Sequence, residues 1–281
     1  MKYMNNKKLT DIFFSTPKLS IKNDTYFDIY EFIFNSYRGK PITFIEVGVF
    51  NGGSLHMWRE YFGDQARIIG VDFNPIALEL EKDGFEIYIG NQESSEFWLD
   101  LKSKVGEADI ILDDGGHKNG QQISTLYNGV ELIKDGGVIV VEDTHTSYFR
   151  RFGNPSPFSF INYSKNIVDV INSRFQYVDS KKSKFYSLVW SVGYFESIVV
   201  FHINKSKSQM GSPIVNQGES IGAIDFRNYS NQFAMNISKL EDWMCSFRII
   251  KPGKRVVSKL FDWLIYLQEL TSNIKLLKYF K

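Results

Sequence analysis

Residues 46–54 read EVGVFNGGS, and the interpretation of the whole chain starts from them. The apolar run ITFI at 42–45 precedes them and is typical of a buried strand, whereas residues 55–62 carry apolar side chains at helical spacing. The glycines therefore lie in a predicted strand-to-helix turn, where the backbone bends sharply and can approach a ligand closely. The helix that begins there offers unpaired N–H groups. Glu46 at the end of the strand disfavours a pyrophosphate and favours a cationic or hydroxyl-rich ligand.

The next predicted strand, RIIGV at 67–71, ends in Asp72. An acidic residue about 20 positions past a glycine-rich turn binds ribose hydroxyls in α/β nucleotide sites. Gly48 and Gly52 are separated by three residues, and the turn lacks the Gly-x-Gly of the dinucleotide fingerprint. The pattern resembles motif I of the class I S-adenosylmethionine-dependent methyltransferases. The alternative interpretation is a tight turn that has no ligand.

Composition narrows the class of protein. A chain of 281 residues with 43% hydrophobic residues suits one large domain, or one domain with an appendage. A net charge of +1 gives no field that would attract nucleic acid or an anionic membrane. The single cysteine, Cys245, excludes an internal disulfide and suits a reducing cytoplasm. Residues 1–10 lack the apolar core of a signal peptide, and no apolar run is long enough for a membrane span, so we expect a cytoplasmic protein.

Strand-like and helix-like segments alternate along the chain. Strands are predicted at 42–45, 67–71, 85–90, 108–112 and 138–141, and helices at 26–37, 55–62, 75–82, 94–101, 120–134 and 160–175. Residues 135–137 (DGG) are predicted to cap the helix at 120–134. The segments 185–190 and 197–203, with Gly193 between them, are predicted to form an antiparallel hairpin. The expected fold is a Rossmann-like, seven-stranded, mostly parallel sheet with helices on both faces and a final antiparallel hairpin.

Three regions are predicted. Residues 1–40 would form an N-terminal arm, irregular to about residue 24, followed by the first helix. Residues 41–204 would form the cofactor-binding domain. Residues 205–281 would form a linker and a C-terminal helical extension with helices at 239–247 and 256–270. This extension is expected to pack on the domain or on a second copy of the chain, in a homo-oligomer. The alternative is a membrane-surface contact through a basic cluster at Lys251, Lys254, Arg255 and Lys259.

Acidic side chains follow two neighbouring predicted strands. Asp113, Asp114 and His117 end one strand, and Glu142, Asp143 and His145 end the next. Adjacent parallel strands lie roughly 4.8 Å apart, so these side chains can converge. Carboxylates that share a small volume need a cation, and oxygen ligands suit a hard divalent ion, Mg²⁺ first, with Mn²⁺ or Ca²⁺ as alternatives. His117 is the candidate general base, because its unperturbed pKa lies near working pH. The alternative is that these are solvated turn residues or helix caps.

Together these motifs extend the resemblance. EVGVFNGGSLHMW (46–58), GVD (70–72), GNQ (90–92), DDGGH (113–117) and GGVIVVEDTHTSY (136–148) resemble the metal-dependent sugar O-methyltransferases of the macrocin and mycinamicin type and the related cephalosporin-hydroxylase-like proteins. The resemblance covers roughly residues 20–150. It implies an S-adenosylmethionine site lined by Glu46, Gly48, Gly52, Ser54, Asp72, Asn91, Gln92 and Asp113. It also implies a metal held by Asp114, Glu142 and Asp143, with His117 as base and Asp114 assisting catalysis.

The leading hypothesis is a metal-assisted O-methyltransferase that acts on a sugar hydroxyl, in particular on a nucleotide-activated sugar of a surface polysaccharide. Small-molecule methylation in natural-product biosynthesis is the alternative acceptor class. A metal-dependent oxygenase is disfavoured by the carboxylate-rich cluster, since ferrous sites usually have two histidines and one carboxylate. A dehydrogenase is disfavoured by the glycine spacing and Glu46, and a scaffold protein without activity by the intact acidic clusters.

Overall fold

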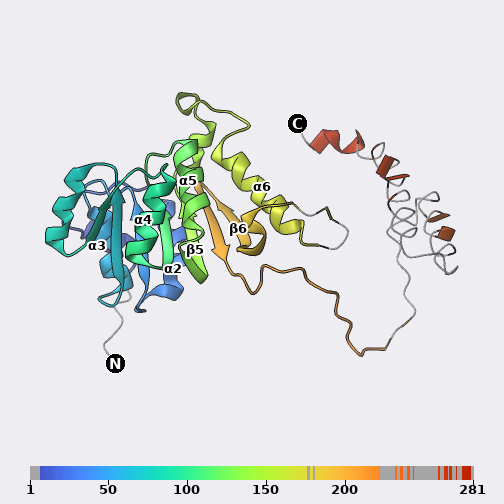
Figure 1. Cartoon of the computed structure of the whole chain (residues 1–281), viewed down its shortest axis with the longest axis horizontal. Coiled ribbons are helices and arrows are strands. Elements are labelled where there is room, and N and C mark those ends of the chain that lie inside the picture. Colours follow the sequence, from blue (N-terminus) through green and yellow to red (C-terminus); the bar gives the residue numbers. More distant parts are fainter. Residues whose placement is uncertain are drawn as a thin grey trace. The chain divides into compact units, whose positions relative to one another are not determined.

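The computed structural model describes residues 7–175, 178–179, 181–219 and 221, and beyond these a few short stretches between residues 232 and 279 (Figure 1). The chain divides into two compact units, Met1–Pro213 and Ile214–Lys281. In the second unit, the 3-10 helix η6 (Ile274–Tyr279) is described. Most of both predicted C-terminal helices, and Lys251, Lys254 and Arg255 of the predicted basic cluster, lie outside the described residues. No described helix has the length and apolar character needed to cross a membrane.

The first unit is built on one seven-stranded sheet with the order β3-β2-β1-β4-β5-β7-β6. Its strands are β1 (Thr43–Val47), β2 (Arg67–Asp72), β3 (Glu86–Ile89), β4 (Ala108–Asp113), β5 (Ile133–Val141), β6 (Val189–Phe195) and β7 (Ile198–Ile203). The first five strands pair in parallel, and β7 pairs antiparallel with both β5 and β6. This arrangement confirms the predicted sheet and its final hairpin.

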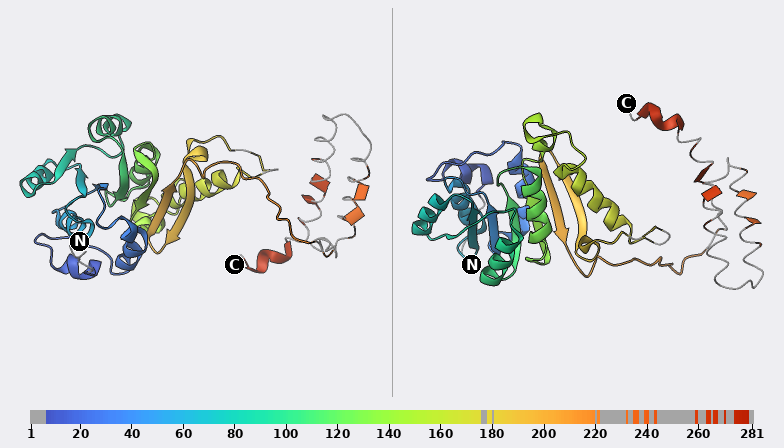
Figure 2. Two further views of the ribbon diagram at one scale, coloured as in Figure 1. Left: turned by 90° about the horizontal axis from the view of Figure 1, so that it is seen from below. Right: turned by 45° about the horizontal axis from the view of Figure 1, so that its top comes forward.

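Helices cover both faces of the sheet because successive strand residues point to opposite sides. On β4, Ile110 packs into one hydrophobic cluster and Ile111 into the other. The first cluster takes in α1 (Leu9–Phe14), α2 (Tyr26–Phe34) and α3 (Gly53–Phe62). The second takes in α4 (Ser95–Val105), α5 (Asn119–Gly129) and α6 (Phe160–Asn172). Figures 1 and 2 show the strands between the two groups of helices.

The prediction for the N-terminal segment was wrong, whereas two predicted helices are present but differ in helix type over part or all of their length. Residues 9–14 form helix α1 instead of an irregular arm, because Leu9 and Ile12 are buried. The predicted helix at 26–37 ends as α2 at Phe34 and continues as the 3-10 helix η1 (Asn35–Tyr37). The predicted helix at 75–82 is the 3-10 helix η2 (Pro75–Asp83).

The helix predicted to reach Lys134 ends at Gly129, and residues 135–137 are no helix cap. Gly129 packs against the sheet, where a Cβ would lie 3.1 Å from Ile111 Cδ1. The chain then enters β5, and Gly137 lies so close to β4 that a Cβ would be 2.5 Å from the Asp109 carbonyl oxygen. The DGG triplet therefore lies inside β5, where the register between β4 and β5 shifts and Gly137 allows the close approach to β4.

The loop predicted at 146–158 contains two short 3-10 helices, η3 (Thr144–Tyr148) and η4 (Arg150–Phe152). The segment predicted as a strand at 185–190 begins as the 3-10 helix η5 (Lys184–Ser187), and β6 starts only at Val189. Gly193 lies inside β6, not in the hairpin turn. The turn is formed at residues 196–197, where Ser197 adopts a positive φ of 60°.

Candidate active site

A pocket of about 890 Å³ lies at the carboxyl ends of the parallel strands. Loops that follow β1, β2, β3 and β4 form its walls, as expected for a ligand site in an open α/β sheet. Eight residues were predicted to bind the cofactor. Five of them line the pocket, namely Gly48, Ser54, Asp72, Asn91 and Gln92. The lining does not include Glu46, Gly52 and Asp113.

The turn after β1 is fixed by neighbouring backbone. Gly48 has a φ of 85°, and a Cβ on it would lie 2.3 Å from the carbonyl oxygen of Asp114. A Cβ on Gly53 would lie 2.4 Å from the carbonyl oxygen of Lys18. These two glycines therefore allow protein segments to pack closely, whereas the sequence predicted close approach of a ligand. Asp72 holds the same turn, because its Oδ2 accepts a hydrogen bond from the Val49 N–H at 3.0 Å.

Glu46 and Asp113 lie behind the pocket wall. Glu46 is fully buried and accepts hydrogen bonds from Ser54 Oγ at 2.8 Å and Trp58 Nε1 at 3.3 Å. Burial raises the pKa of Glu46 to about 7. Asp113 is also buried, which raises its pKa, and its Oδ1 accepts from Gln92 Nε2 at 3.1 Å. Asp113 therefore positions Gln92, which does line the pocket.

The side chain of Lys22 lies among the acidic residues and is 1% exposed. Its Nζ donates to Asp114 Oδ2 at 2.7 Å and to Glu142 Oε2 at 2.9 Å, and lies 3.8 Å from Glu46 Oε1. Burial by itself lowers the pKa of Lys22, but the three carboxylates outweigh burial, and its pKa is raised above the ordinary lysine value. The ammonium group is therefore positively charged and neutralises part of this cluster.

Glu142 belongs to this buried part of the site. It is fully buried and also accepts a hydrogen bond from the Tyr30 hydroxyl. Burial, followed by the nearby Asp114 carboxylate, raises the pKa of Glu142 well above its ordinary value. Burial also raises the pKa of Tyr30, so its hydroxyl stays protonated and remains a donor. Glu142 is not among the residues that line the pocket.

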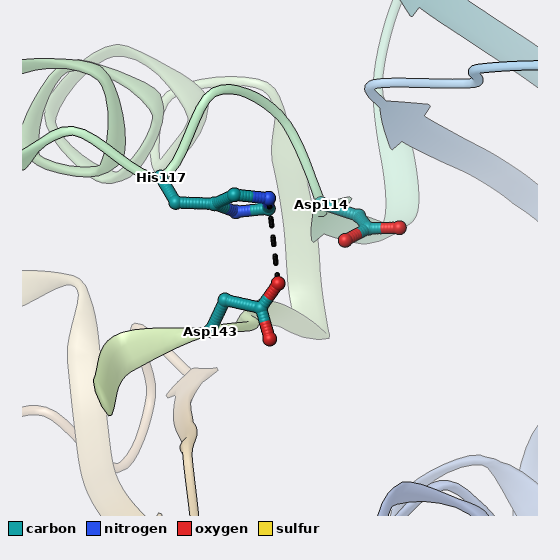
Figure 3. A group of neighbouring side chains, drawn as sticks. All are labelled: Asp114, His117 and Asp143. Atoms are coloured by element: carbon teal, nitrogen blue, oxygen red, sulfur yellow. Dashed lines mark ion pairs between the residues drawn. The ribbon is translucent and has the colours of Figure 1, made fainter. Parts of the chain in front are cut away.

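Asp114, His117 and Asp143 form a second group, which faces the pocket (Figure 3). One ligand atom from each of these residues lies within 4.8 Å of the others, an arrangement that could hold a metal ion. His117 Nε2 lies 3.3 Å from Asp143 Oδ2, and each of these two side chains is about a quarter exposed, at 28% and 26%. The Tyr26 hydroxyl donates to the other oxygen of Asp143, Oδ1. Asp143 is thus held from one side and contacts the histidine from the other.

Backbone conformation supports a functional role for this group. His117 and Asp143 have positive φ angles of 57° and 53°. Such conformations are unfavourable for residues other than glycine and concentrate at functional sites. Thr146 Oγ1 donates to the His117 carbonyl oxygen at 2.9 Å and to that of Asp143 at 2.8 Å, which stabilises both strained turns.

Of the other three histidines, only His145 lies near this group, with its Nδ1 3.9 Å from Asp143 Oδ1. His145 Nδ1 shares a hydrogen bond with Ser197 Oγ, and its ring contacts the edge of Phe149. His56 packs edge-on against Phe85. His202 lies on β7, where burial lowers its pKa.

The sequence interpretation missed Lys22, Tyr26 and Tyr30. All three come from residues assigned to an N-terminal arm and helix, far along the chain from the acidic strand ends. The signal in the sequence that could have revealed Lys22 was charge balance. Several carboxylates predicted to converge need positive charge, and a lysine of the chain supplies it as well as a bound ion does.

The strand order, the antiparallel final pair and the pocket at the carboxyl ends define the fold of the class I S-adenosylmethionine-dependent methyltransferases. The mycinamicin-pathway methyltransferase MycE, solved in complex with Mg, SAH and mycinamycin VI, has a similar fold. Its TM-score is 0.66 at 21% sequence identity, and the match covers 76% of this chain and 58% of that one. No family model matches the chain.

Two curated proteins show the sequence similarity directly. A Streptomyces olivaceus 3'-O-methyltransferase of 8-demethyl-8-(2-methoxy-alpha-L-rhamnosyl)-tetracenomycin-C is 34% identical over 132 residues, which are 44% of this chain and 33% of that protein. The Streptomyces fradiae demethylmacrocin O-methyltransferase is 26% identical over 170 residues, which are 56% of this chain and 42% of that protein. The chain thus resembles the macrocin and mycinamicin type of sugar O-methyltransferase, although it spans less than half the length of these relatives.

Proposed function

We propose that this protein transfers a methyl group from S-adenosylmethionine to a hydroxyl group of a sugar. A divalent cation, with Mg²⁺ as the first candidate, binds beside the carboxylates of Asp114 and Asp143. The observation that carries the proposal is the position of His117, Asp114 and Asp143 on the wall of a pocket whose other walls are the turn after β1 and Asp72. A general base and a group of potential metal ligands thus adjoin a cavity of nucleoside size. The similarity to sugar O-methyltransferases supports this assignment.

The pocket walls fit the proposed methyl donor. Asp72 has both oxygens at the pocket end of β2, and each accepts one backbone N–H, from Val49 or Asn74. A carboxylate oxygen accepts more than one hydrogen bond, so Asp72 can also receive ribose hydroxyls. Asn91 after β3 offers its side-chain amide to the nucleoside base, whereas the amide of the buried Gln92 already bonds to Asp113, Thr125 and Gly116. Gly48 and Ser54 border the region proposed for the amino-acid end.

The pocket-facing donor set fits a hard divalent ion. Asp114 and Asp143 offer carboxylate oxygens, and the remaining positions are open to the acceptor or to water. When bound, the methyl donor supplies an activated methyl group, and the ion supplies positive charge that lowers the pKa of an acceptor hydroxyl. His117 then accepts the hydroxyl proton at a ring nitrogen. Asp143 orients the imidazole, because its Oδ2 lies 3.3 Å from Nε2.

A cluster of one histidine and two carboxylates differs from the two histidines and one carboxylate of ferrous oxygenases, which disfavours the oxygenase hypothesis. For the acceptor, we propose a sugar hydroxyl of a glycoside, because one relative is named for a rhamnosylated tetracenomycin and another for demethylmacrocin. The alternative acceptor, which the sequence analysis put forward, is a nucleotide-activated sugar for a surface polysaccharide. A screen of both acceptor classes distinguishes glycosides from nucleotide-activated sugars.

The donor site is tested by thermal unfolding with S-adenosylmethionine, S-adenosylhomocysteine or NAD, each with and without Mg²⁺. We expect the first two ligands to raise the unfolding temperature and NAD to leave it unchanged. Stabilisation by NAD alone would overturn the proposal.

The chemistry is tested by mass spectrometry of glycosides and nucleotide-activated sugars incubated with the protein and the methyl donor. We expect the gain of one methyl group, abolished in His117→Ala and retained in His56→Ala. His56 is the matched control, since it packs against Phe85 away from the pocket lining. Undiminished transfer by His117→Ala would exclude the proposed base.

A further inference from the structure

We propose that two cations neutralise the acidic cluster formed by Glu46, Asp114, Glu142 and Asp143. The ammonium group of Lys22 permanently occupies the position between Asp114 and Glu142, and a divalent ion binds in the pocket-facing position between Asp114, His117 and Asp143. The inference deepens the proposed function and rests on its metal site. It assigns Glu142 to the lysine, whereas the resemblance to known enzymes assigned Glu142 to the metal.

The first argument is the contact geometry of the ammonium group. The distances of 2.7 Å to Asp114 Oδ2 and 2.9 Å to Glu142 Oε2 are those of charge-assisted hydrogen bonds. A metal ion bound to these same two oxygens would have to expel the ammonium group. Asp114 still has Oδ1, which Lys22 does not use, and its side chain is 21% exposed, so it can serve both cations.

The second argument is that the chain anchors Lys22 on both sides. Before it, the backbone of Lys18 and Leu19 packs against Gly53 at the start of α3, and Lys18 Nζ pairs with Asp83 at 2.5 Å. After it, α2 begins at Tyr26, whose hydroxyl bonds to Asp143. One turn further along α2, the Tyr30 hydroxyl bonds to Glu142. The segment from residue 18 to residue 30 is therefore built onto the cluster, and the lysine is one of several contacts that fix it.

The third argument is the division of the cluster by burial. Glu46 and Glu142 are fully buried and do not line the pocket, whereas Asp114, His117 and Asp143 do. A hydrated divalent ion that enters from the pocket therefore contacts Asp114, His117 and Asp143 before it can reach Glu142. Glu142 lies behind it, with one oxygen bonded to Tyr30 and both within 3.1 Å of Lys22 Nζ. The ammonium group thus balances the buried carboxylates, and the exchangeable ion balances the pocket-facing ones.

The test is Mn²⁺ binding to the whole protein, measured by electron paramagnetic resonance of the free ion without methyl donor or acceptor. In the wild-type background, Asp143→Asn should weaken binding by at least about tenfold, while Glu142→Gln should change it by less than about threefold. In a Lys22→Met background, Glu142 is released, so Glu142→Gln should now weaken binding by at least about tenfold. The expected result is therefore that the effect of Glu142→Gln on Mn²⁺ affinity depends on whether Lys22 is present.

Lys18→Met is the matched control, because it removes a lysine from the same segment without touching the cluster, and it should leave Mn²⁺ affinity unchanged. If Lys22→Met does not fold, the comparison of Glu142→Gln with Asp143→Asn in the wild-type background decides by itself. Equal weakening by these two substitutions would show that the ion binds Glu142 and would overturn the inference. Absence of Mn²⁺ binding to the wild-type protein would overturn it as well. Stabilisation by S-adenosylhomocysteine, measured on the same samples, reports separately on the donor site.

Discussion

Replacing Lys22 by Met should destabilise the first unit far more than replacing any surface lysine. The substitution keeps most of the side-chain volume and removes the ammonium group, so the carboxylates of Asp114, Glu142 and Glu46 lose their cation. Breaking a buried ion pair by removing one partner costs about 3–5 kcal/mol, because an uncompensated charge stays buried. The 1% exposure of Lys22 and its contacts at 2.7 and 2.9 Å place it in this class.

The expected loss is about 3–5 kcal/mol in the free energy of unfolding, or roughly 6–20 °C in the unfolding temperature for a unit of this size. Lys18→Met breaks a partly exposed pair and should cost only about 0–1 kcal/mol. Urea unfolding followed by far-ultraviolet circular dichroism at pH 7, without divalent ions, measures both variants. Adding Glu142→Gln to Lys22→Met should recover part of the loss, since a glutamine still accepts the Tyr30 hydrogen bond without carrying a charge. If Lys22→Met is no less stable than Lys18→Met, the ammonium group does not balance the buried carboxylates.

Three further predictions address the pocket. Gly48→Ala should lower the free energy of unfolding, measured in urea, by at least about 1–3 kcal/mol, and by more than Gly63→Ala. Both glycines have a positive φ, but only at Gly48 would an added Cβ lie 2.3 Å from a backbone atom. Equal losses in the two variants would argue against this clash. Asp72→Asn should weaken S-adenosylhomocysteine binding in calorimetry by about tenfold, and unchanged affinity would remove Asp72 from the donor site. Because the pKa of Glu46 is raised from 4.5 to about 7, the folded protein retains a proton that the unfolded chain loses; this contribution is present below pH 4.5 and is lost as the pH rises through 7. The free energy of unfolding of the wild-type protein, minus that of Glu46→Gln, should therefore decline by up to about 3 kcal/mol between pH 5 and pH 8. A difference that does not change with pH would contradict the raised pKa.

Much of the fold follows from patterns that act over a few residues. Runs such as RIIGV at 67–71 and ADIIL at 108–112 predict buried strands, because both faces of a parallel sheet are covered. Parallel strands place their carboxyl ends at one edge, so Asp72, Asp114 and Asp143 could be assigned to one pocket from the sequence. Helix ends were predicted less well. The helix α5 ends at Gly129 and β5 begins at Ile133, so the chain joins the sheet within the range predicted as helix, and no local pattern reports that pairing.

The sequence by itself determined the α/β class, the strand succession and the acidic residues at the strand ends, since hydrophobic periodicity and residue type are local properties. Only the tertiary structure decided which cation those residues meet. Lys22 lies 92 positions before Asp114 and 120 before Glu142, in a segment without a periodic pattern. Its place follows from the cost of burying carboxylates without a counter-charge, a quantity that exists only once distant parts of the chain are packed together.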